Sequence, residues 1–167
     1  PSEEESISQF KILRAMTSDN GMDHYEISNF AKPGFYSQHN TNYWGDVKYL
    51  GIGPSAHSYN LTQREWNIPD IAKYIAGINK GERVYEVEDL DKRDHFNEYF
   101  IRSLRTKWGV NLKKISEQFG NEKVGYVKHV AKKYFNNGML YTKGDSIRLT
   151  EKGMFISDAL LEDFLII

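Results

Sequence analysis

The chain has 167 residues, of which 40% are hydrophobic and 27% charged, a composition typical of a globular protein with one domain or two small ones. No apolar run approaches the roughly 18 residues of a membrane-spanning helix, and the acidic N-terminus lacks the apolar core of a secretory signal. The chain contains no cysteine, which excludes disulfides, thiolate metal sites and cysteine nucleophiles within it. These features together favour a cytoplasmic protein.

The two halves of the chain carry opposite charge. Residues 91–167 hold 14 Lys+Arg against 10 Asp+Glu, whereas residues 1–90 hold 8 against 13. The resulting +4 and −5 indicate two modules. Because Lys80-Gly81-Glu82-Arg83 precedes an acidic stretch, we predict domains over 1–80 and 81–167.

The first half should mix helices and short strands. Ser2 is placed to cap a helix that ends at Asn20-Gly21, and Pro69-Asp70 should open a second helix that Gly81 closes. The expected apolar faces of these two helices carry Ile7, Phe10, Leu13 and Met16, and Ile71, Tyr74, Ile75 and Ile78. Short β-like runs cover residues 24–28, 48–53 and 57–61. The stretch 29–46 is predicted to be irregular and poorly ordered.

The second half should be mainly helical and should fold independently over residues 91–167. Three helices are predicted, over residues 94–107, 112–119 and 122–136. Residues 139–142 and 146–149 form a predicted hairpin, and Thr150 should cap a final helix that carries Phe155, Ala159 and Leu160. The order of three helices, a hairpin and a closing helix is winged-helix-like, so the predicted fold class is α+β.

The densest group of polar and aromatic residues runs from Gln38 to Trp44. The ring of His39 could ligate an iron porphyrin while the neighbouring aromatic side chains pack on the macrocycle. The spacing by itself favours a plainer alternative, in which loop carbonyls satisfy His39 and the side chains of Tyr43 and Trp44 are buried.

A second motif, residues 49–58, places two glycines at the end of an apolar run, where a ligand could approach the backbone closely. It is not a dinucleotide fingerprint, because Ala56 stands at the third glycine position and Pro54 interrupts the helix start. No Gly-Lys-Ser/Thr follows, so a phosphate loop is also excluded. By itself the motif predicts a tight strand end.

The remaining candidates carry weaker signals. His24, His95 and His129 lack the i, i+4 partner of a helical zinc site and should be surface or packing residues. Glu26 could be a buried acid, although no second carboxylate is placed for an acid/base pair. The lysines between residues 113 and 133 belong to a half of only +4, which argues against nucleic-acid binding.

Taken as a set, several motifs resemble consecutive signatures of the oxygen-independent coproporphyrinogen III oxidase-like family. They are Tyr-Glu-Ile-Ser-Asn-Phe-Ala-Lys-Pro-Gly at 25–34, His-Asn-x-x-Tyr-Trp at 39–44, and Tyr-Leu-Gly-Ile-Gly-Pro-Ser-Ala-His-Ser at 49–58. The segments 104–110 and 147–153 resemble the family's C-terminal domain, so the resemblance covers nearly the whole chain.

The resemblance implies the last segments of a radical-SAM TIM-like barrel, followed by a mainly helical, winged-helix-like domain. The whole protein would bind a 4Fe-4S cluster through an upstream Cys-x-x-x-Cys-x-x-Cys loop and would also bind S-adenosylmethionine. This chain would then hold no catalytic residue and no bound cofactor of its own. Ala56 and His57 match the positions nearest to S-adenosylmethionine. A barrel remnant would also expose apolar surface and favour self-association.

The His39-Asn40-x-x-Tyr43-Trp44 form resembles the heme-chaperone (HemW-type) branch of the family. It implies heme iron bound by His39 beside Asn40, Tyr43 and Trp44, and an acceptor heme protein as partner. Two alternatives remain open: an oxidase that converts coproporphyrinogen III to protoporphyrinogen IX, and a winged-helix module that binds protein or DNA.

Overall fold

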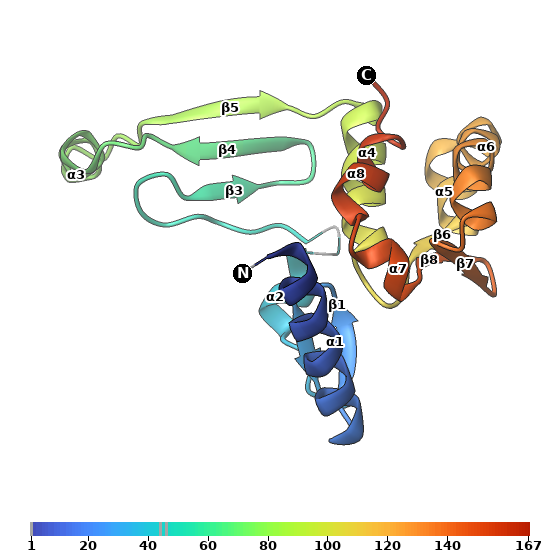
Figure 1. The fold of residues 1–167 in the computed structure, drawn as a ribbon. Helices are drawn as coiled ribbons and strands as arrows, with labels where there is room; N and C mark the ends of the chain where they lie inside the picture. The colour runs from blue at the N-terminus through green and yellow to red at the C-terminus, as the bar shows by residue number, and fades with distance from the viewer. Residues whose placement is uncertain (1, 44, 46) are drawn as a thin grey trace. The chain divides into compact units, whose positions relative to one another are not determined.

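A computed structural model describes residues 2–43, 45 and 47–167, and for Tyr43 the backbone alone. Helices are mixed with short strands along the chain, as Figure 1 shows, and the strands of each sheet pair antiparallel, so the predicted α+β class is confirmed. The chain folds into two compact units: Pro1–Trp44 with Phe96–Ile167, and Gly45–His95. The predicted domains, 1–80 and 81–167, are each continuous in sequence, whereas the first of these units combines two segments that are far apart in sequence.

The first helix, α1 (Glu3–Asp19), begins as predicted. The hydroxyl of Ser2 accepts a hydrogen bond from the Glu5 backbone N–H, and the Glu5 carboxylate accepts one from the Ser2 N–H. Glu3, Glu4 and Glu5 also place negative charge at the positive end of the helix dipole. No residue of α1 is buried, and Leu13 and Met16 of its predicted apolar face are 46% and 61% exposed.

The stretch 29–46 is more regular than its sequence indicated. Strand β1 (Asp23–Glu26) pairs antiparallel with β2 (Asn29–Ala31), and the six-residue helix α2 (Gln38–Tyr43) follows. The prediction that this stretch contains no regular element was wrong. Strand β2 and helix α2 have only three and six residues, which are too few to show a hydrophobic period in the sequence. Trp44 and Asp46 lie outside the described residues.

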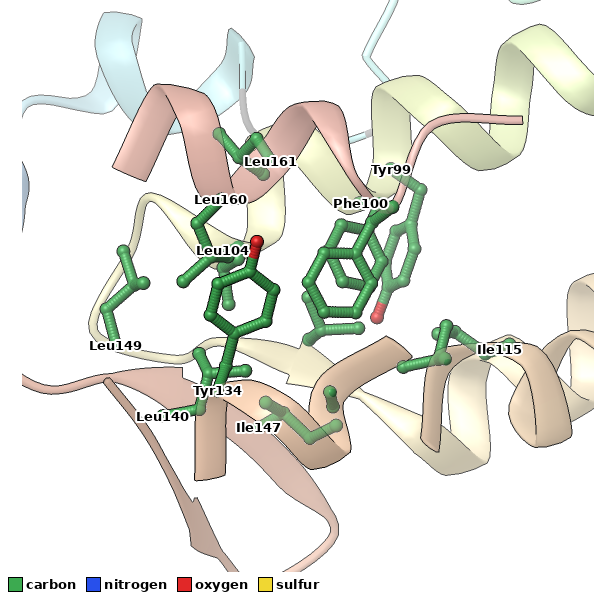
Figure 2. Packing of buried hydrophobic residues seen from close by; sticks show 14 of the residues in the cluster. Tyr99, Phe100, Leu104, Ile115, Tyr134, Leu140, Ile147, Leu149, Leu160 and Leu161 are labelled. Carbon is green, nitrogen blue, oxygen red and sulfur yellow. The ribbon is translucent and has the colours of Figure 1, made fainter. Parts of the chain in front are cut away.

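The C-terminal helices are α4 (Lys92–Leu104), α5 (Leu112–Phe119) and α6 (Asn121–Asn136), close to their predicted ranges. Their apolar faces enclose one hydrophobic core (Figure 2). The ring of Phe100 stacks on Phe164 with centroids 4.4 Å apart, and Phe164 also stacks on Tyr134 at 5.9 Å. The described core consists of Phe96, Tyr99, Phe100, Leu104, Val110, Ile115, Val127, Ala131, Tyr134, Leu140, Ile147, Leu149, Leu160, Leu161 and Phe164.

A three-stranded antiparallel sheet completes this unit. The predicted hairpin consists of β7 (Leu140–Lys143) and β8 (Ser146–Leu149), and β6 (Val110–Asn111) adds to the other edge of β8. Gly109, just before β6, has φ +70°, and a Cβ there would stand 2.2 Å from the Ile147 carbonyl oxygen. Only glycine therefore allows the chain to enter the sheet at this position. The winged-helix comparison itself stays a prediction.

The closing helix differs from its prediction. Thr150 caps α7 (Glu151–Met154) through its side chain, but the helix stops there and α8 (Ser157–Glu162) follows as a separate element. Ala159 is exposed, whereas Leu160 and Leu161 are buried. Because the helix is interrupted after Met154, the buried face of α8 consists of Ser157, Leu160 and Leu161. The prediction of one continuous helix placed Ala159 on that face instead.

The second unit is built on the antiparallel sheet β3-β4-β5, with β3 (His57–Tyr59), β4 (Gln63–Asn67) and β5 (Tyr85–Asp89) in chain order (Figure 1). Helix α3 (Ile71–Asn79) lies between β4 and β5 in sequence and begins at its predicted cap, Asp70. Strands β4 and β5 were not predicted. Residues 48–53, predicted as a strand, contribute only the isolated bridge between Tyr49 and Tyr59.

The interior of this second unit is small and partly polar. Among its described residues, the buried side chains are those of Ser58, Tyr59 and Asn67. Large apolar side chains are exposed on it, namely Val47, Leu50, Ile52, Ile71, Ile75, Ile78, Val84, Tyr85 and Val87. The expected exposure of apolar surface is therefore confirmed, and self-association stays a prediction.

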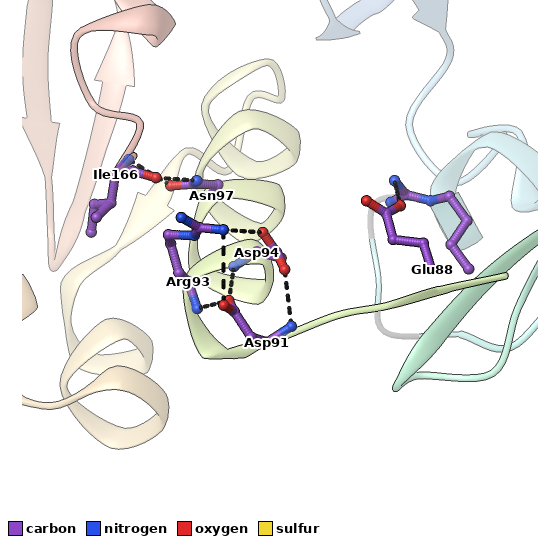
Figure 3. A network of polar contacts seen from close by, with 7 residues as sticks. Glu88, Asp91, Arg93, Asp94, Asn97 and Ile166 are labelled. Carbon is purple, nitrogen blue, oxygen red and sulfur yellow. Dashed lines mark hydrogen bonds and ion pairs between the residues drawn. The ribbon is translucent and has the colours of Figure 1, made fainter.

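One set of polar contacts caps the start of α4, and another attaches the segment after α8 to α4 (Figure 3). The Asp91 carboxylate accepts hydrogen bonds from the N–H groups of Arg93 and Asp94, and the Asp94 carboxylate accepts one from the Asp91 N–H. The Asn97 side chain donates to the Ile166 carbonyl and accepts from its N–H, both at 2.9 Å.

Within the described residues, no helix is long and apolar enough to cross a membrane.

Candidate functional site

His39 lies in the first turn of α2, and its side chain is exposed. The hydroxyl of Ser37, just before the helix, accepts a hydrogen bond from the Asn40 N–H at 3.2 Å, and its carbonyl accepts one from the Thr41 N–H at 2.9 Å. A serine in this role satisfies N–H groups that a helix start leaves without partners. The histidine thus stands on a short but capped helix.

A chain of hydrogen bonds fixes α2 to the β1–β2 hairpin. The Asn40 side-chain amide donates to the Asn29 side-chain oxygen at 3.2 Å. Asn29 in turn donates to the Glu26 carboxylate at 2.6 Å, which also accepts from the Ser28 N–H at 3.0 Å. The residue beside His39 is therefore tied to a carboxylate at the end of β1.

Glu26 is only 4% exposed and is the buried acid that its position in a β run suggested. Its second oxygen lies 3.6 Å from Nε of Arg105, which also contacts Asp158. Backbone hydrogen bonds join the same segments: Ile27 N–H donates to the Arg105 carbonyl, and Lys107 N–H donates to the Tyr25 carbonyl. A buried carboxylate needs such partners, so Glu26 acts as a structural acceptor.

His24, in β1, packs against the partner strand of the hairpin and is one of the histidines predicted to be surface or packing residues. Its ring stacks on Phe30 with centroids 4.2 Å apart, and Nε2 lies 2.8 Å from the Ile27 carbonyl oxygen. Because a carbonyl can only accept, Nε2 carries the proton and Nδ1 is the bare nitrogen. Burial lowers the pKa of His24, which keeps the ring neutral, and the Ile27 hydrogen bond opposes this shift only in part.

Asp23, at the start of β1, contacts Lys107 and Tyr36. Lys107 Nζ lies 2.6 Å from its carboxylate, and the Tyr36 hydroxyl also donates to it. These two side-chain hydrogen bonds lower the pKa of Asp23. Tyr36 directly precedes the cap of α2, so this cluster provides a second attachment for the segment that carries His39.

The two glycines of residues 49–58 have different reasons: Gly51 makes a close backbone contact within the second unit, and Gly53 has a φ of +108°. A Cβ on Gly51 would stand 2.2 Å from the His57 carbonyl oxygen, so the backbones pass too closely for any side chain. Gly51 N–H donates to the Ser58 hydroxyl and Gly53 N–H to the Tyr74 hydroxyl. The Ala56 N–H donates to the Gly53 carbonyl at 3.3 Å, and the His57 side chain is exposed.

Asn67, which the sequence did not single out, holds the loop of residues 51–53 through side-chain hydrogen bonds. Its amide is 1% exposed and donates to the carbonyls of Gly51 and Gly53, at 3.3 and 2.9 Å. Its oxygen accepts from Arg83 Nε at 2.8 Å, and Arg83 also pairs with Glu65 at 2.7 Å. Its partners lie 14 to 16 residues away, so no local pattern could have identified the role.

The structure therefore brings some predicted site residues together. His39 and Asn40 share a helix that is anchored by Asn29 and Glu26 of the preceding motif. Asn29 lies within the motif at 25–34, which was the only signal for it in the sequence. Trp44 and the side chain of Tyr43 lie outside the described residues, and Ala56 and His57 belong to the other unit. No group of potential metal ligands occurs among the residues that are described.

Comparison with known proteins found a matching domain family, similar sequences and a similar solved structure. Residues 90–156 match the family described as the HemN C-terminal domain. The heme chaperone HemW of Lactococcus lactis is 32% identical over 168 residues, which cover 99% of this chain and 44% of that protein. The Bacillus subtilis heme chaperone HemW is 29% identical over 166 residues, with the same coverage of 99% and 44%.

A solved structure shares the fold. It is that of coproporphyrinogen III oxidase (HemN) from Escherichia coli, described as a radical SAM enzyme. The TM-score is 0.76 at 18% identity, over 99% of this chain and 42% of that one. The chain thus spans less than half the length of the relatives it matches. Residues 90–156 carry the HemN C-terminal domain, and nearly the whole chain is similar to the C-terminal part of HemN/HemW-like proteins.

Proposed function

We propose that the protein is a heme chaperone of the HemW type, which binds heme through the imidazole of His39 and passes it to an acceptor heme protein. The observation that carries the proposal is the placement of His39: an exposed imidazole on a capped helix tied to the buried Glu26. The names of the relatives supply the class of function.

The described residues fit such a ligand. Heme iron takes an imidazole nitrogen as an axial ligand, which requires an accessible histidine, and the macrocycle needs apolar surface. His39 is exposed, and Phe35, four residues earlier, is 79% exposed. Asn40, Tyr43 and Trp44 complete the proposed heme-binding segment. The hydrogen bonds of Asn40 and Ser37 would keep the imidazole in place while its iron partner binds or leaves.

The radical-SAM part of the proposal concerns the rest of the protein. Without cysteine, this chain offers no ligand set for a 4Fe-4S cluster, so we assign the cluster and most of the S-adenosylmethionine pocket to regions outside it. Ala56 and His57 are proposed as the positions nearest to S-adenosylmethionine. The first segments would close a TIM-like barrel, and the C-terminal domain would be winged-helix-like.

A hemin titration followed at the Soret band tests the proposal. The expected result is a saturable shift that His39→Ala abolishes and that His129→Ala leaves intact, since His129 is an exposed histidine on α6. A shift that survives His39→Ala would refute the assigned ligand. Turnover of coproporphyrinogen III by the complete, cluster-loaded protein would support the oxidase alternative instead.

A further inference from the structure

Strand β5 forms an open edge of the sheet in the second unit. The strand order is β3-β4-β5, so β4 pairs with one side of β5, and no described strand pairs with the other (Figure 1). All five residues of β5 are exposed. A free edge presents backbone N–H and C=O groups that another strand can bind.

The hydrogen bonds to β4 determine which backbone groups of β5 are free. In an antiparallel pair, residues that exchange hydrogen bonds with the neighbouring strand alternate with residues that do not. The Leu90 N–H donates to the Thr62 carbonyl at 2.9 Å, which assigns the even-numbered residues of β5 to the ladder with β4. The N–H and C=O groups that point away from the sheet therefore belong to Tyr85, Val87 and Asp89.

The side chains of β5 separate by character between its two faces. Successive residues of a strand point to opposite faces, so Tyr85, Val87 and Asp89 share one face, and Glu86 and Glu88 share the other. Tyr85 and Val87 are 46% and 51% exposed. A strand paired with this edge would place alternate side chains beside an apolar pair and an acidic pair.

The charge of the acidic pair is only partly compensated within the sheet. Arg64 of β4 pairs with Glu88 at 3.6 Å. Glu86 instead accepts a hydrogen bond from the indole N–H of Trp66 at 3.0 Å, and an indole carries no charge. Among the described residues Glu86 makes no ion pair, so its negative charge has no compensating cation.

The face that carries Tyr85 also keeps one negative charge. The guanidinium carbon of Arg83 lies 4.3 Å from the centroid of the Tyr85 ring, but Arg83 pairs with Glu65 at 2.7 Å, so these two charges cancel. Asp89 accepts a hydrogen bond from the neutral amide of Gln63 at 2.7 Å and makes no ion pair in the described part of the chain. The edge therefore stays negative after its own ion pairs are counted.

This negative charge argues against two possible occupants. Two copies of β5 paired antiparallel about Val87 would set Glu86 of one copy opposite Glu88 of the other, and like charges directly opposite destabilise a sheet. A strand held permanently inside a barrel by the rest of the protein is buried on both faces and needs apolar residues. Three of the five residues of β5 are acidic, which fits an edge that faces water until a positively charged strand binds.

We propose that β5 is a docking edge for an extended basic segment of a partner protein, which adds to the three-stranded sheet as a further strand. The backbone of that segment pairs with Tyr85, Val87 and Asp89, and its Lys or Arg side chains lie beside Glu86 and Glu88. Apolar residues at the alternate positions cover Tyr85 and Val87. The proposal is independent of the heme function, because neither His39 nor α2 takes part.

The test titrates the complete protein into the fluorescently labelled peptide Lys-Val-Lys-Val-Lys-Val and follows its anisotropy. Amide hydrogen exchange of β5 is measured by NMR in parallel. We expect saturable binding, together with slower exchange at Tyr85, Val87 and Asp89, whose N–H groups gain partners. The peptide Glu-Val-Glu-Val-Glu-Val should bind about tenfold or more weakly, because its carboxylates face Glu86 and Glu88.

Two variants separate the backbone contribution from the charge contribution. Val87→Pro removes an N–H that faces away from β4, so it leaves the ladder intact and should weaken binding by about threefold to tenfold. Glu86→Gln, which still accepts from Trp66, should weaken it by about threefold and serves if the proline variant unfolds. Glu117→Gln, an exposed residue of α5 in the other unit, is the matched control and should leave binding unchanged.

Four results would overturn the docking edge. They are absence of saturable binding, equal affinity for the lysine and glutamate peptides, binding that neither variant weakens, and slow exchange at Tyr85, Val87 and Asp89 in the complete protein without peptide. In the last case, sedimentation at several protein concentrations distinguishes the cause: protection that appears with dimer formation assigns the edge to a second copy, and protection in the monomer assigns it to the protein's own chain.

Discussion

The side-chain amide of Asn40 donates a hydrogen bond to the side-chain oxygen of Asn29 across 3.2 Å, and so joins α2 to the β1–β2 hairpin. Asn29 passes the connection to the buried carboxylate of Glu26. Two motifs that are separate in sequence thereby become one structure, with His39 at its exposed end. The arrangement suggests that the asparagine beside the histidine positions the helix that presents it.

Replacement of Asn40 by Ala should weaken hemin binding severalfold without changing the identity of the iron ligand. The lost hydrogen bond should lower the free energy of unfolding by only about 0.5–1.5 kcal/mol. The Soret titration and urea unfolding measure the two effects separately. Asn42→Ala is the control, since Asn42 is an exposed residue of the same helix. Equal hemin affinity for both variants would exclude a positioning role for Asn40.

The stability of the chain should depend on pH through His24. Burial lowers the pKa of this histidine in the folded state, whereas in the unfolded chain it titrates near its ordinary value of about 6.5. Below that pH the unfolded state binds a proton that the folded state does not. The free energy of unfolding should therefore fall as the pH drops from 7 through 6.5 toward the lowered folded-state pKa.

His24→Gln should flatten this dependence, because glutamine can still donate to the Ile27 carbonyl but does not titrate. Urea unfolding at pH 7.0 and 5.5 provides the measurement. His129→Gln, on the exposed face of α6, should retain the wild-type slope. An unchanged slope in the His24 variant would show that His24 is not the titrating group.

Asn67→Ala should destabilise the second unit and increase the mobility of the loop of residues 51–58. The substitution leaves the carbonyls of Gly51 and Gly53 and Nε of Arg83 without their partner, at a cost of about 2 kcal/mol or more. Hydrogen exchange should then accelerate at the amides of residues 51–58. Asn79→Ala, at the exposed end of α3, should change neither quantity. Unaltered protection of the loop would contradict the role of Asn67.

Two glycines in helices should respond to alanine in opposite directions. A Cβ on Gly153 would stand 2.1 Å from the Met139 carbonyl oxygen, so Gly153→Ala should cost about 1–3 kcal/mol of stability. Gly125 in α6 has no atom within 4 Å of such a Cβ, so Gly125→Ala should stabilise by about 0.5–1 kcal/mol. Thermal unfolding of the two variants distinguishes the cases: an unchanged or higher midpoint for Gly153→Ala would refute the packing at Gly153, and a lower midpoint for Gly125→Ala would refute the open space at Gly125.

The sequence predicted the C-terminal core well because its helices are amphipathic. Phe96, Tyr99, Phe100 and Leu104 recur at helical spacing, and all four are buried. Strands β4 and β5 were not predicted, because they lack such a pattern of buried apolar residues. All five residues of β5 are exposed, and its partner in β4 lies about 20 residues upstream, so neither burial alternation nor a short turn marked the pair.

The sequence by itself determined where the capped helices α1, α3 and α7 begin, which faces of the C-terminal helices are apolar, and which family the motifs resemble, because these properties depend on neighbours within a few residues. Only the tertiary structure decided what Asn29 and Asn67 do. Polar side chains take their roles from partners brought near by folding: a buried carboxylate for Asn29 and two loop carbonyls for Asn67. Hydrogen bonds act over about 3 Å in space, whatever the separation along the chain.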